Sequence, residues 1–197
     1  MNGSKQIRIF SATLIFCIVA PLSAVADTFQ VSNAATFDTG IIVAGAGTLL
    51  RKADGVELRV EMAGLDSNSA YTLWWIIFNN PDECEHGADP ADCGLGDVGN
   101  PDDFGPADTA VRNAAGFISS PSGTGNTTGE LDVGAVAVGN FGFGQLNDSV
   151  GAEIHIVIQT HGRPLVGSVA QQMTIPGAAC NKKCEDQFGI VFLPVAP

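Results

Sequence analysis

Hydrophobic and polar residues alternate most cleanly over Gly55–Met62 (GVELRVEM), where every second residue is apolar and the residues between are charged. A period of two is typical of a β-strand with one buried and one solvent-facing side. The turn-forming segment Gly64–Ser69 (GLDSNS) follows, and a second apolar run begins at Ala70. We therefore predict two strands joined as an antiparallel hairpin with a longer loop.

The second run, Tyr71–Phe78 (YTLWWIIF), is apolar on both of its alternating faces. This pattern predicts a central strand that is covered on both sides. Because side chains alternate across a strand, Trp74 and Trp75 must point to opposite faces and cannot form one flat stacking platform. We expect one indole in the core and the other under a loop or at a contact surface. A single exposed tryptophan would support a glycan-binding module.

Short runs rich in Val and Ile recur between clusters of Gly, Pro, Asn and Asp, and no later segment has a helical period over 11 or more residues. The predicted strands are Phe29–Val31, Ile41–Ala44, Val111–Ile118, Glu130–Val138, Glu153–Thr160, Gln171–Ile175 and Gly189–Leu193. This organisation predicts a single all-β domain over residues 27–197, either an antiparallel β-sandwich or a barrel-like sheet. The segments Asn79–Asp108 and Ser119–Gly129 lack a strand pattern and are predicted to be loops.

Residues 1–26 have the features of an export signal. Two basic residues precede an apolar stretch, which ends in the small-residue motif Ala24-Val25-Ala26. We predict cleavage near Ala26 and a secreted or periplasmic location. No later segment approaches the roughly 20 apolar residues needed to span a bilayer, so no membrane insertion is expected.

Four cysteines follow the predicted signal, and an exported chain usually joins an even set as disulfides. The short separations favour the local pairs Cys84–Cys93 and Cys180–Cys184. A connectivity that links the two segments to each other remains open. A zinc site that uses Cys84, His86, Cys93 and one of the two later cysteines is the alternative, but export disfavours it.

The chain is acidic, with 21 Asp and Glu residues against nine Lys and Arg and a formal net charge of −12. Such a charge repels phosphate backbones and anionic lipid, so nucleic acid and membrane surfaces are not expected partners. Cations, an extracytoplasmic protein or a glycan remain as possible partners.

Many of the carboxylates lie in Asn79–Asp108, and no Lys or Arg occurs between Arg59 and Arg112. Calcium takes six to eight oxygen ligands in irregular geometry, so this loop is a candidate calcium site, with calcium the one cofactor considered. The candidate ligands are Asp82, Glu85, Asp89, Asp92, Asp97, Asp102 and Asp103. No stretch matches the EF-hand loop pattern. A solvated acidic loop without a metal is the alternative.

Glu153 and His155 lie two residues apart and therefore on one strand face, where both side chains could reach a cation with a partner from elsewhere. A row of polar surface residues is the alternative. The chain has no G-x-S-x-G motif, and disulfide formation would leave no cysteine as a nucleophile. We therefore expect a non-enzymatic structural or binding domain. The alternative is a metal-dependent enzyme that uses Glu153, His155 and carboxylates of the acidic loop.

The segments Leu58–Asn80 (LRVEMAGLDSNSAYTLWWIIFNN) and Glu153–Gly162 (EIHIVIQTHG) resemble uncharacterised exported bacterial β proteins. Through a strand, a Gly-Leu turn and a second strand, they also resemble chordin-type domains and the sandwich of the copper/zinc superoxide dismutases. The resemblance implies an antiparallel sandwich. The copper chemistry is not implied, because the strand after the turn carries Trp74, Trp75 and Phe78 where that pattern requires histidines.

Overall fold

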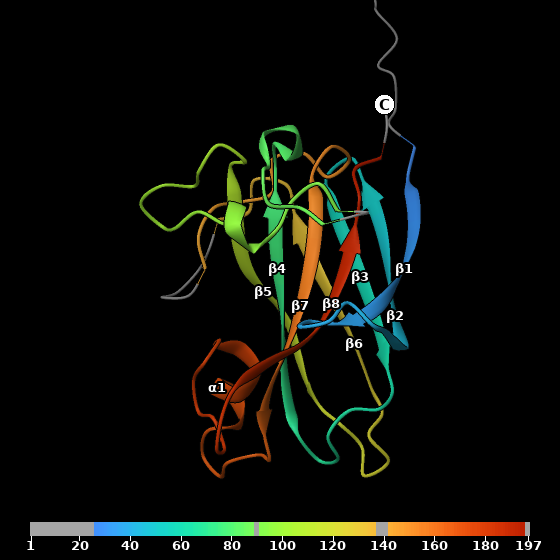
Figure 1. Ribbon diagram of the computed structural model, residues 1–197, viewed down its shortest axis with the longest axis vertical. Coiled ribbons are helices and arrows are strands. Elements are labelled where there is room, and N and C mark those ends of the chain that lie inside the picture. The colour runs from blue at the N-terminus through green and yellow to red at the C-terminus, as the bar shows by residue number, and fades with distance from the viewer. Residues whose placement is uncertain (1–25, 89–90, 137–141, 196–197) are drawn as a thin grey trace, which may run out of the picture.

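The computed structural model describes residues 26–88, 91–136 and 142–195 (Figure 1). Eight strands form one antiparallel sheet in the order β5-β4-β7-β8-β1-β2-β3-β6. The strands are β1 (Thr28–Thr36), β2 (Ile42–Lys52), β3 (Gly55–Met62), β4 (Ala70–Phe78), β5 (Thr109–Ile118), β6 (Gly125–Asp132), β7 (Glu153–Gly162) and β8 (Glu185–Phe192). Three short helices complete the fold, namely the 3-10 turns η1 (Pro81–Glu83) and η2 (Leu95–Asp97) and the helix α1 (Val169–Thr174). None of the helices in the described ranges has the length and apolarity needed to cross a membrane.

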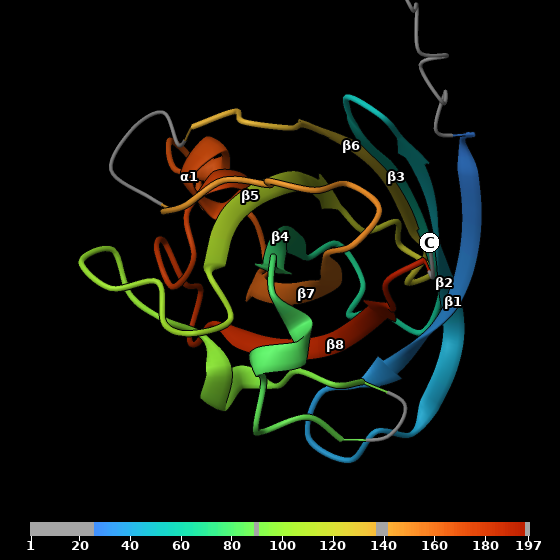
Figure 2. The same ribbon diagram turned by 90° about the horizontal axis from the view of Figure 1, so that it is seen from above.

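The sheet curls round on itself into a nearly closed barrel (Figure 2). The two end strands, β5 and β6, come close without pairing. A Cβ on Gly129 of β6 would lie 2.9 Å from the carbonyl oxygen of Ala114 on β5, so this approach depends on the absence of a side chain. The all-β antiparallel prediction is confirmed, and the barrel-like form is the one adopted.

Alternating side chains fill the barrel interior. On β3 the residues Val56, Leu58, Val60 and Met62 are buried, while Arg59 and Glu61 are exposed, as the period of two predicts. Similar alternating sets from β4, β7 and β8, together with one or two residues from each of the other strands, join them in one hydrophobic cluster. Burial of this apolar surface is the main force that closes the sheet.

One cation, Arg51 of β2, lies fully buried at the end of this interior. All five of its N–H groups donate hydrogen bonds, to the side-chain oxygen of Gln30 and to the carbonyls of Ser149, Ala152, Phe192 and Leu193. Burial lowers the pKa of the guanidinium to about 10, although the charge of Asp148 acts in the opposite direction. Arg51 thereby ties β2 to β1, to the segment before β7 and to the end of β8.

The predicted hairpin of Gly55–Met62 with the strand from Ala70 is wrong. Strand β3 lies between β2 and β6, whereas β4 lies between β5 and β7. The segment Gly64–Ser69 therefore crosses to another part of the barrel wall. Its turn-forming residues signal a change of direction, but they do not specify which strand becomes the neighbour.

The predicted strand Gln171–Ile175 is also wrong, because α1 occupies Val169–Thr174. Short apolar runs do not distinguish a helix from a strand. The predicted strand Glu130–Val138 begins too late, since β6 starts at Gly125, inside the segment predicted to be a loop. Residues 137 and 138 of that prediction lie outside the described residues.

All nine residues of β4 are buried, as predicted for a strand covered on both faces. Trp75 lies in the barrel interior, whereas Trp74 packs outside it, with Cys93 and Ala107 of the loop. The described parts of the segment 79–108 extend from one end of the barrel, and α1 lies at the other (Figure 1). The two tryptophans therefore have the separate packing roles predicted for them.

Candidate functional site

The described residues contain two disulfides, Cys84–Cys93 and Cys180–Cys184. The local connectivity is therefore confirmed, and the cross-linked alternative is wrong. Sulfurs that are bonded to each other offer no thiolate, so the structure also contradicts a zinc site built on Cys84, His86 and Cys93. Paired cysteines fit an oxidising compartment.

Within the loop, Asp97 is a central acceptor rather than a free ligand. Its carboxylate accepts the backbone N–H groups of Glu85 at 2.8 Å, His86 at 3.1 Å and Gly94 at 2.8 Å. Its Oδ1 also lies 2.7 Å from Nδ1 of the His86 ring. With its side chain only 5 % exposed, Asp97 holds the two sides of the disulfide-closed segment together.

These contacts shift the pKa values of both Asp97 and His86. Burial acts to raise the pKa of Asp97, but the hydrogen bonds from Glu85, His86 and Gly94 outweigh it and lower the pKa to about 2. The same carboxylate raises the pKa of His86, chiefly through the hydrogen bond between them. Both oxygens of Asp97 are already used within the loop.

The remaining calcium candidates do not converge. Asp82, Glu85, Asp92, Asp102 and Asp103 are exposed, and Asp89 lies outside the described residues. Asp82 and Asp92 line one pocket of about 490 Å³ with Glu83, without forming a compact ligand set. In the described part of the chain, the one group of three or more His, Cys, Asp or Glu donors close enough to share an ion lies elsewhere. Calcium binding by the loop remains a prediction.

Glu153 and His155 do not form a polar surface row. Glu153 is fully buried, and its carboxylate accepts the backbone N–H groups of Asp92 and Cys93, each at 3.1 Å. Nε2 of His155 lies 2.6 Å from Glu153 Oε1, and its ring packs edge-on against Phe78. The pair anchors the acidic loop to the outer face of β7.

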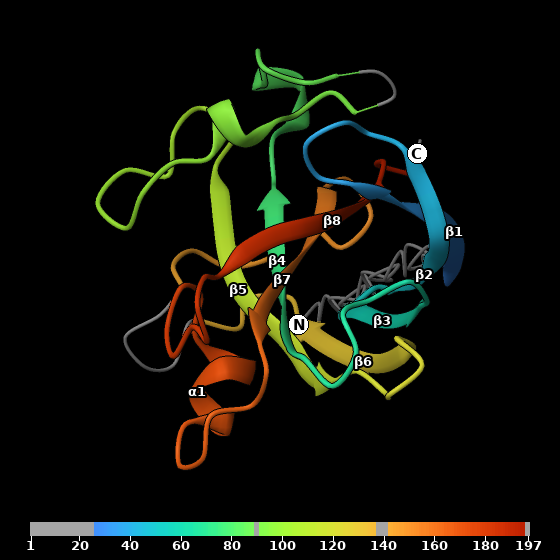
Figure 3. The same cartoon turned by 60° about the horizontal axis from the view of Figure 1, so that its bottom comes forward.

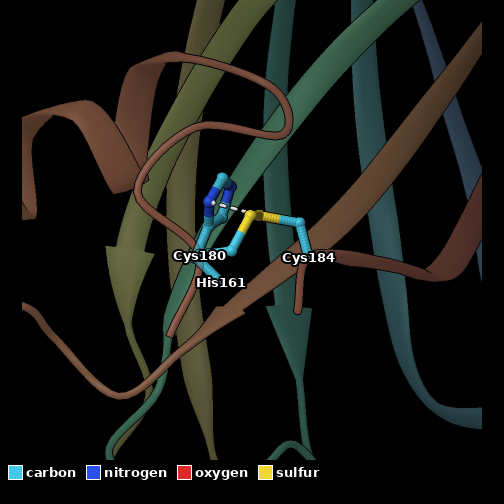
Figure 4. A group of neighbouring side chains, drawn as sticks. All are labelled: His161, Cys180 and Cys184. Carbon is cyan, nitrogen blue, oxygen red and sulfur yellow. Dashed lines mark hydrogen bonds between the residues drawn. A yellow bond between two sulfur atoms is a disulfide. The ribbon is translucent and has the colours of Figure 1, made fainter. Parts of the chain in front are cut away.

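At the opposite end of the barrel, three atoms that could bind a metal ion lie close together. The sequence patterns did not predict a site there. The three atoms are Nδ1 of His161, at the end of β7, and the Sγ atoms of Cys180 and Cys184 (Figure 4). All three lie within 4.8 Å of one another, and Cys184 Sγ is 3.2 Å from His161 Nδ1. His161 is fully buried, and both cysteines are half-buried.

The His161 ring is fixed at both nitrogens. Nδ1 lies 2.8 Å from the carbonyl oxygen of Ala178, and Nε2 lies 2.9 Å from the hydroxyl of Thr72. A carbonyl only accepts, so Nδ1 carries the proton and Nε2 accepts from Thr72. Burial lowers the pKa of His161, although the Ala178 carbonyl and the charge of Asp186 act to raise it. The lowered pKa favours the neutral form of the ring.

The chain after α1 folds back against the end of β7 (Figure 3). The backbone N–H of Asn181 donates to the carbonyl of His161 at 2.8 Å. The neighbouring Gly162 has a φ of +71°, and a Cβ there would lie 2.6 Å from the carbonyl oxygen of Asn181. A glycine at position 162 thus permits both the turn and the close approach of the disulfide loop.

A cleft of about 640 Å³ lies beside this cluster. It is lined by Asp66, Ser67, Ser69, Thr160, Gly162, Arg163, Asn181, Lys182, Lys183 and Glu185. Three of the nine basic residues of the chain are therefore gathered in one place, together with two carboxylates and three hydroxyls. Lys183 pairs with Glu185 at 2.7 Å. The spacing of HGR (161–163) and CNKKC (180–184) is the sequence signal that could have identified this end.

Neither tryptophan is exposed for stacking on a sugar. Trp74 is 3 % exposed and Trp75 is fully buried. Their indole N–H groups are also buried and have no hydrogen-bond partner. The glycan-binding alternative requires an exposed indole, and neither Trp74 nor Trp75 provides one.

Comparison of the chain with protein-family models, with curated proteins and with solved structures found no match. The resemblance to chordin-type domains consequently remains a prediction.

Proposed function

We propose that the chain is an exported, non-enzymatic binding domain whose ligand occupies the cleft at the α1 end of the barrel. The main support is that two cationic side chains of this cleft, Arg163 and Lys182, have no carboxylate partner among the residues that the structure describes. In the described parts of the chain, no ion pair includes Arg163 or Lys182. Both charges are consequently available to a ligand.

The chemistry of the lining favours a small carboxylate ligand with a cationic group, such as a short peptide. Arg163 and Lys182 would bind the carboxylate through charge-assisted hydrogen bonds. Asp66 and Glu185 line the same cleft and would attract an ammonium group. Ser67 supplies a neutral hydroxyl. A cleft of this volume suits a small molecule.

The metal-dependent enzyme alternative is less well supported. Glu153 and His155 already bind each other, and Glu153 binds the backbone of the acidic loop. If the Glu153 carboxylate moved away to bind a metal ion, the backbone N–H groups of Asp92 and Cys93 would lose their acceptor in a buried site. The calcium prediction is independent of the cleft, because the acidic loop lies at the other end of the barrel.

Isothermal titration with a free dipeptide and with its N-acetylated, C-amidated form tests the proposal. The charged dipeptide should bind and the blocked form should bind at least about tenfold more weakly, since each lost charge-assisted hydrogen bond contributes about 1.5–3 kcal/mol. The double variant Arg163→Gln/Lys182→Gln should lose the binding.

A matched control removes the same number of charges elsewhere. Lys52 and Arg59 lie on β2 and β3, and each pairs with a glutamate. The variant Lys52→Gln/Arg59→Gln should retain wild-type affinity. Equal loss in both double variants would indicate a general charge effect, and no binding of the charged dipeptide by the wild type would contradict the proposed ligand class.

A further inference from the structure

The two disulfides of the protein have different surroundings. Cys93 is buried at 1 % exposure beneath the acidic loop, and its backbone is held by Glu153. The histidine nearest to it in sequence, His86, already uses Nδ1 to bind Asp97. Cys184, in contrast, has the Nδ1 atom of a buried histidine 3.2 Å from its sulfur. Among the residues that the structure describes, only the second pair has an imidazole nitrogen close enough to share an ion with its sulfurs.

The donor set of this second pair is that of a thiophilic metal site. Two thiolates and one neutral imidazole are ligands that Cu⁺ and Zn²⁺ prefer. The three donor atoms come from the end of β7 and from the two ends of the segment 180–184, and they already lie within 4.8 Å of one another. For one ion to contact all three atoms, the two sulfurs must separate after reduction, whereas the histidine nitrogen already lies beside them.

As long as the sulfurs are bonded to each other, they cannot bind such an ion. A dithiol reductant would open the pair. One of its thiolates attacks a sulfur, the Cys180–Cys184 bond breaks, and a mixed disulfide forms with one cysteine while the other leaves as a thiolate. The second thiol of the reductant then displaces the first cysteine. The reductant ends as a disulfide, and the two electrons reside on Cys180 and Cys184.

We propose that Cys180, Cys184 and His161 form a redox-controlled site for Cu⁺ or Zn²⁺, closed in the disulfide form and open in the dithiol form. The ion replaces the protons of the two thiols. This inference does not depend on the ligand proposed for the neighbouring cleft, because it uses none of the cleft's charged side chains.

The Thr72 hydroxyl can form a hydrogen bond with Nε2 of His161 whichever ring nitrogen carries the proton. In the disulfide form the Thr72 hydroxyl donates to Nε2, and Nδ1–H donates to Ala178. When Nδ1 binds a metal it must lose its proton, and Nε2–H can then donate to the same hydroxyl, which also accepts. Hydrogen bonds of this kind orient a metal-binding histidine, and their loss typically weakens metal affinity 10–100-fold.

The test compares the oxidised chain with the same chain after phosphine reduction and anaerobic removal of the reductant. Each is titrated with Zn²⁺ and with Cu⁺ against a competing chromophoric chelator, and Co²⁺ serves as a spectroscopic probe. The reduced wild type should bind one ion more per chain than the oxidised form, with a thiolate-to-Co²⁺ charge-transfer band. Cys180→Ser/Cys184→Ser should lose that ion, and Cys84→Ser/Cys93→Ser should retain it.

His161 is buried, so its replacement could unfold the chain, and Thr72→Val provides the second variant. Valine matches the shape of threonine but cannot accept from Nε2–H, so the affinity should fall by about 10–100-fold while circular dichroism stays unchanged. Unchanged affinity in folded Thr72→Val would remove His161 from the ligand set. Equal binding by the oxidised chain, or loss of the ion in Cys84→Ser/Cys93→Ser, would overturn the site.

Discussion

The buried carboxylate of Glu153 accepts the backbone N–H of Cys93 at 3.1 Å across 60 residues of sequence. Its other oxygen accepts the N–H of Asp92, and His155 binds the same group. A buried charge is tolerated only where such donors replace water. The attachment of the acidic loop to the barrel therefore depends on one buried side chain of β7.

Glu153→Gln should destabilise the protein by about 2 kcal/mol or more. The substitution keeps the size of the side chain but replaces one acceptor oxygen with a donor that faces a backbone N–H, and hydrogen bonds to charged groups contribute about 1.5–3 kcal/mol. Urea unfolding measures the change. Glu130→Gln, on the exposed side of β6, makes the same chemical substitution and should alter stability by less than about 0.5 kcal/mol. Similar effects of the two variants would contradict the anchoring role.

Asp97→Asn should destabilise the acidic loop in a pH-dependent way. The folded pKa of Asp97 is about 2, below the ordinary value of 3.8, so its contribution is complete above pH 3.8 and is lost as the pH falls through about 2. The stability difference between wild type and variant, from urea unfolding at a series of pH values, should therefore be full at pH 7 and shrink toward pH 2. A difference that does not change with pH would contradict this assignment.

His86 should report the same contact by NMR titration. Its pKa should lie above the ordinary 6.5 in the wild type and return toward 6.5 in Asp97→Asn. Because the folded pKa is raised, the contribution of protonated His86 is present below pH 6.5 and is lost as the pH rises through the folded value. A His86 titration that is the same in both proteins would place the cause elsewhere than Asp97.

Strand positions were predictable where local patterning decides them, and the neighbours of each strand were not. Alternation located β3 and the two covered faces of β4, and sequence separation gave both disulfides. The hairpin between β3 and β4 failed because strand order is decided by long-range burial around the barrel, which no local period records. The helix α1 was missed because six residues are too few for a helical period.

At the candidate sites, too, local patterns could be predicted from the sequence, whereas long-range contacts could not. Alternation places Glu153 and His155 on one face of β7, as the structure has them, but it does not reveal that Glu153 is buried. Its burial depends on a loop that begins more than 60 residues earlier. The cluster at His161 was missed because its histidine and cysteines are separated by a helix and a loop, and only the fold-back at Asn181 joins them.

Calcium binding by the acidic loop predicts a calcium-specific rise in Tm over the value in chelator, because a ligand that binds only the folded state stabilises it. Asp82→Asn/Asp92→Asn, which neutralises two carboxylates of one pocket, should reduce that rise. Asp54→Asn/Asp132→Asn removes the same charge from other parts of the chain and should leave the rise unchanged. An identical Tm in chelator and in calcium would leave the loop as a solvated acidic segment.

Arg51→Lys should destabilise the protein by at least about 3 kcal/mol, although it conserves the charge. Lysine has three donors on one nitrogen and cannot reproduce the five N–H groups that Arg51 directs to four carbonyls and to Gln30. Several carbonyls would be left unpaired in a buried site, at about 1–3 kcal/mol each. Arg59→Lys is the matched control, because Arg59 is exposed and binds only Glu61, and it should change stability by less than about 0.5 kcal/mol. If urea unfolding gave similar values for both variants, the buried guanidinium would not be what holds β2 to the ends of β1 and β8.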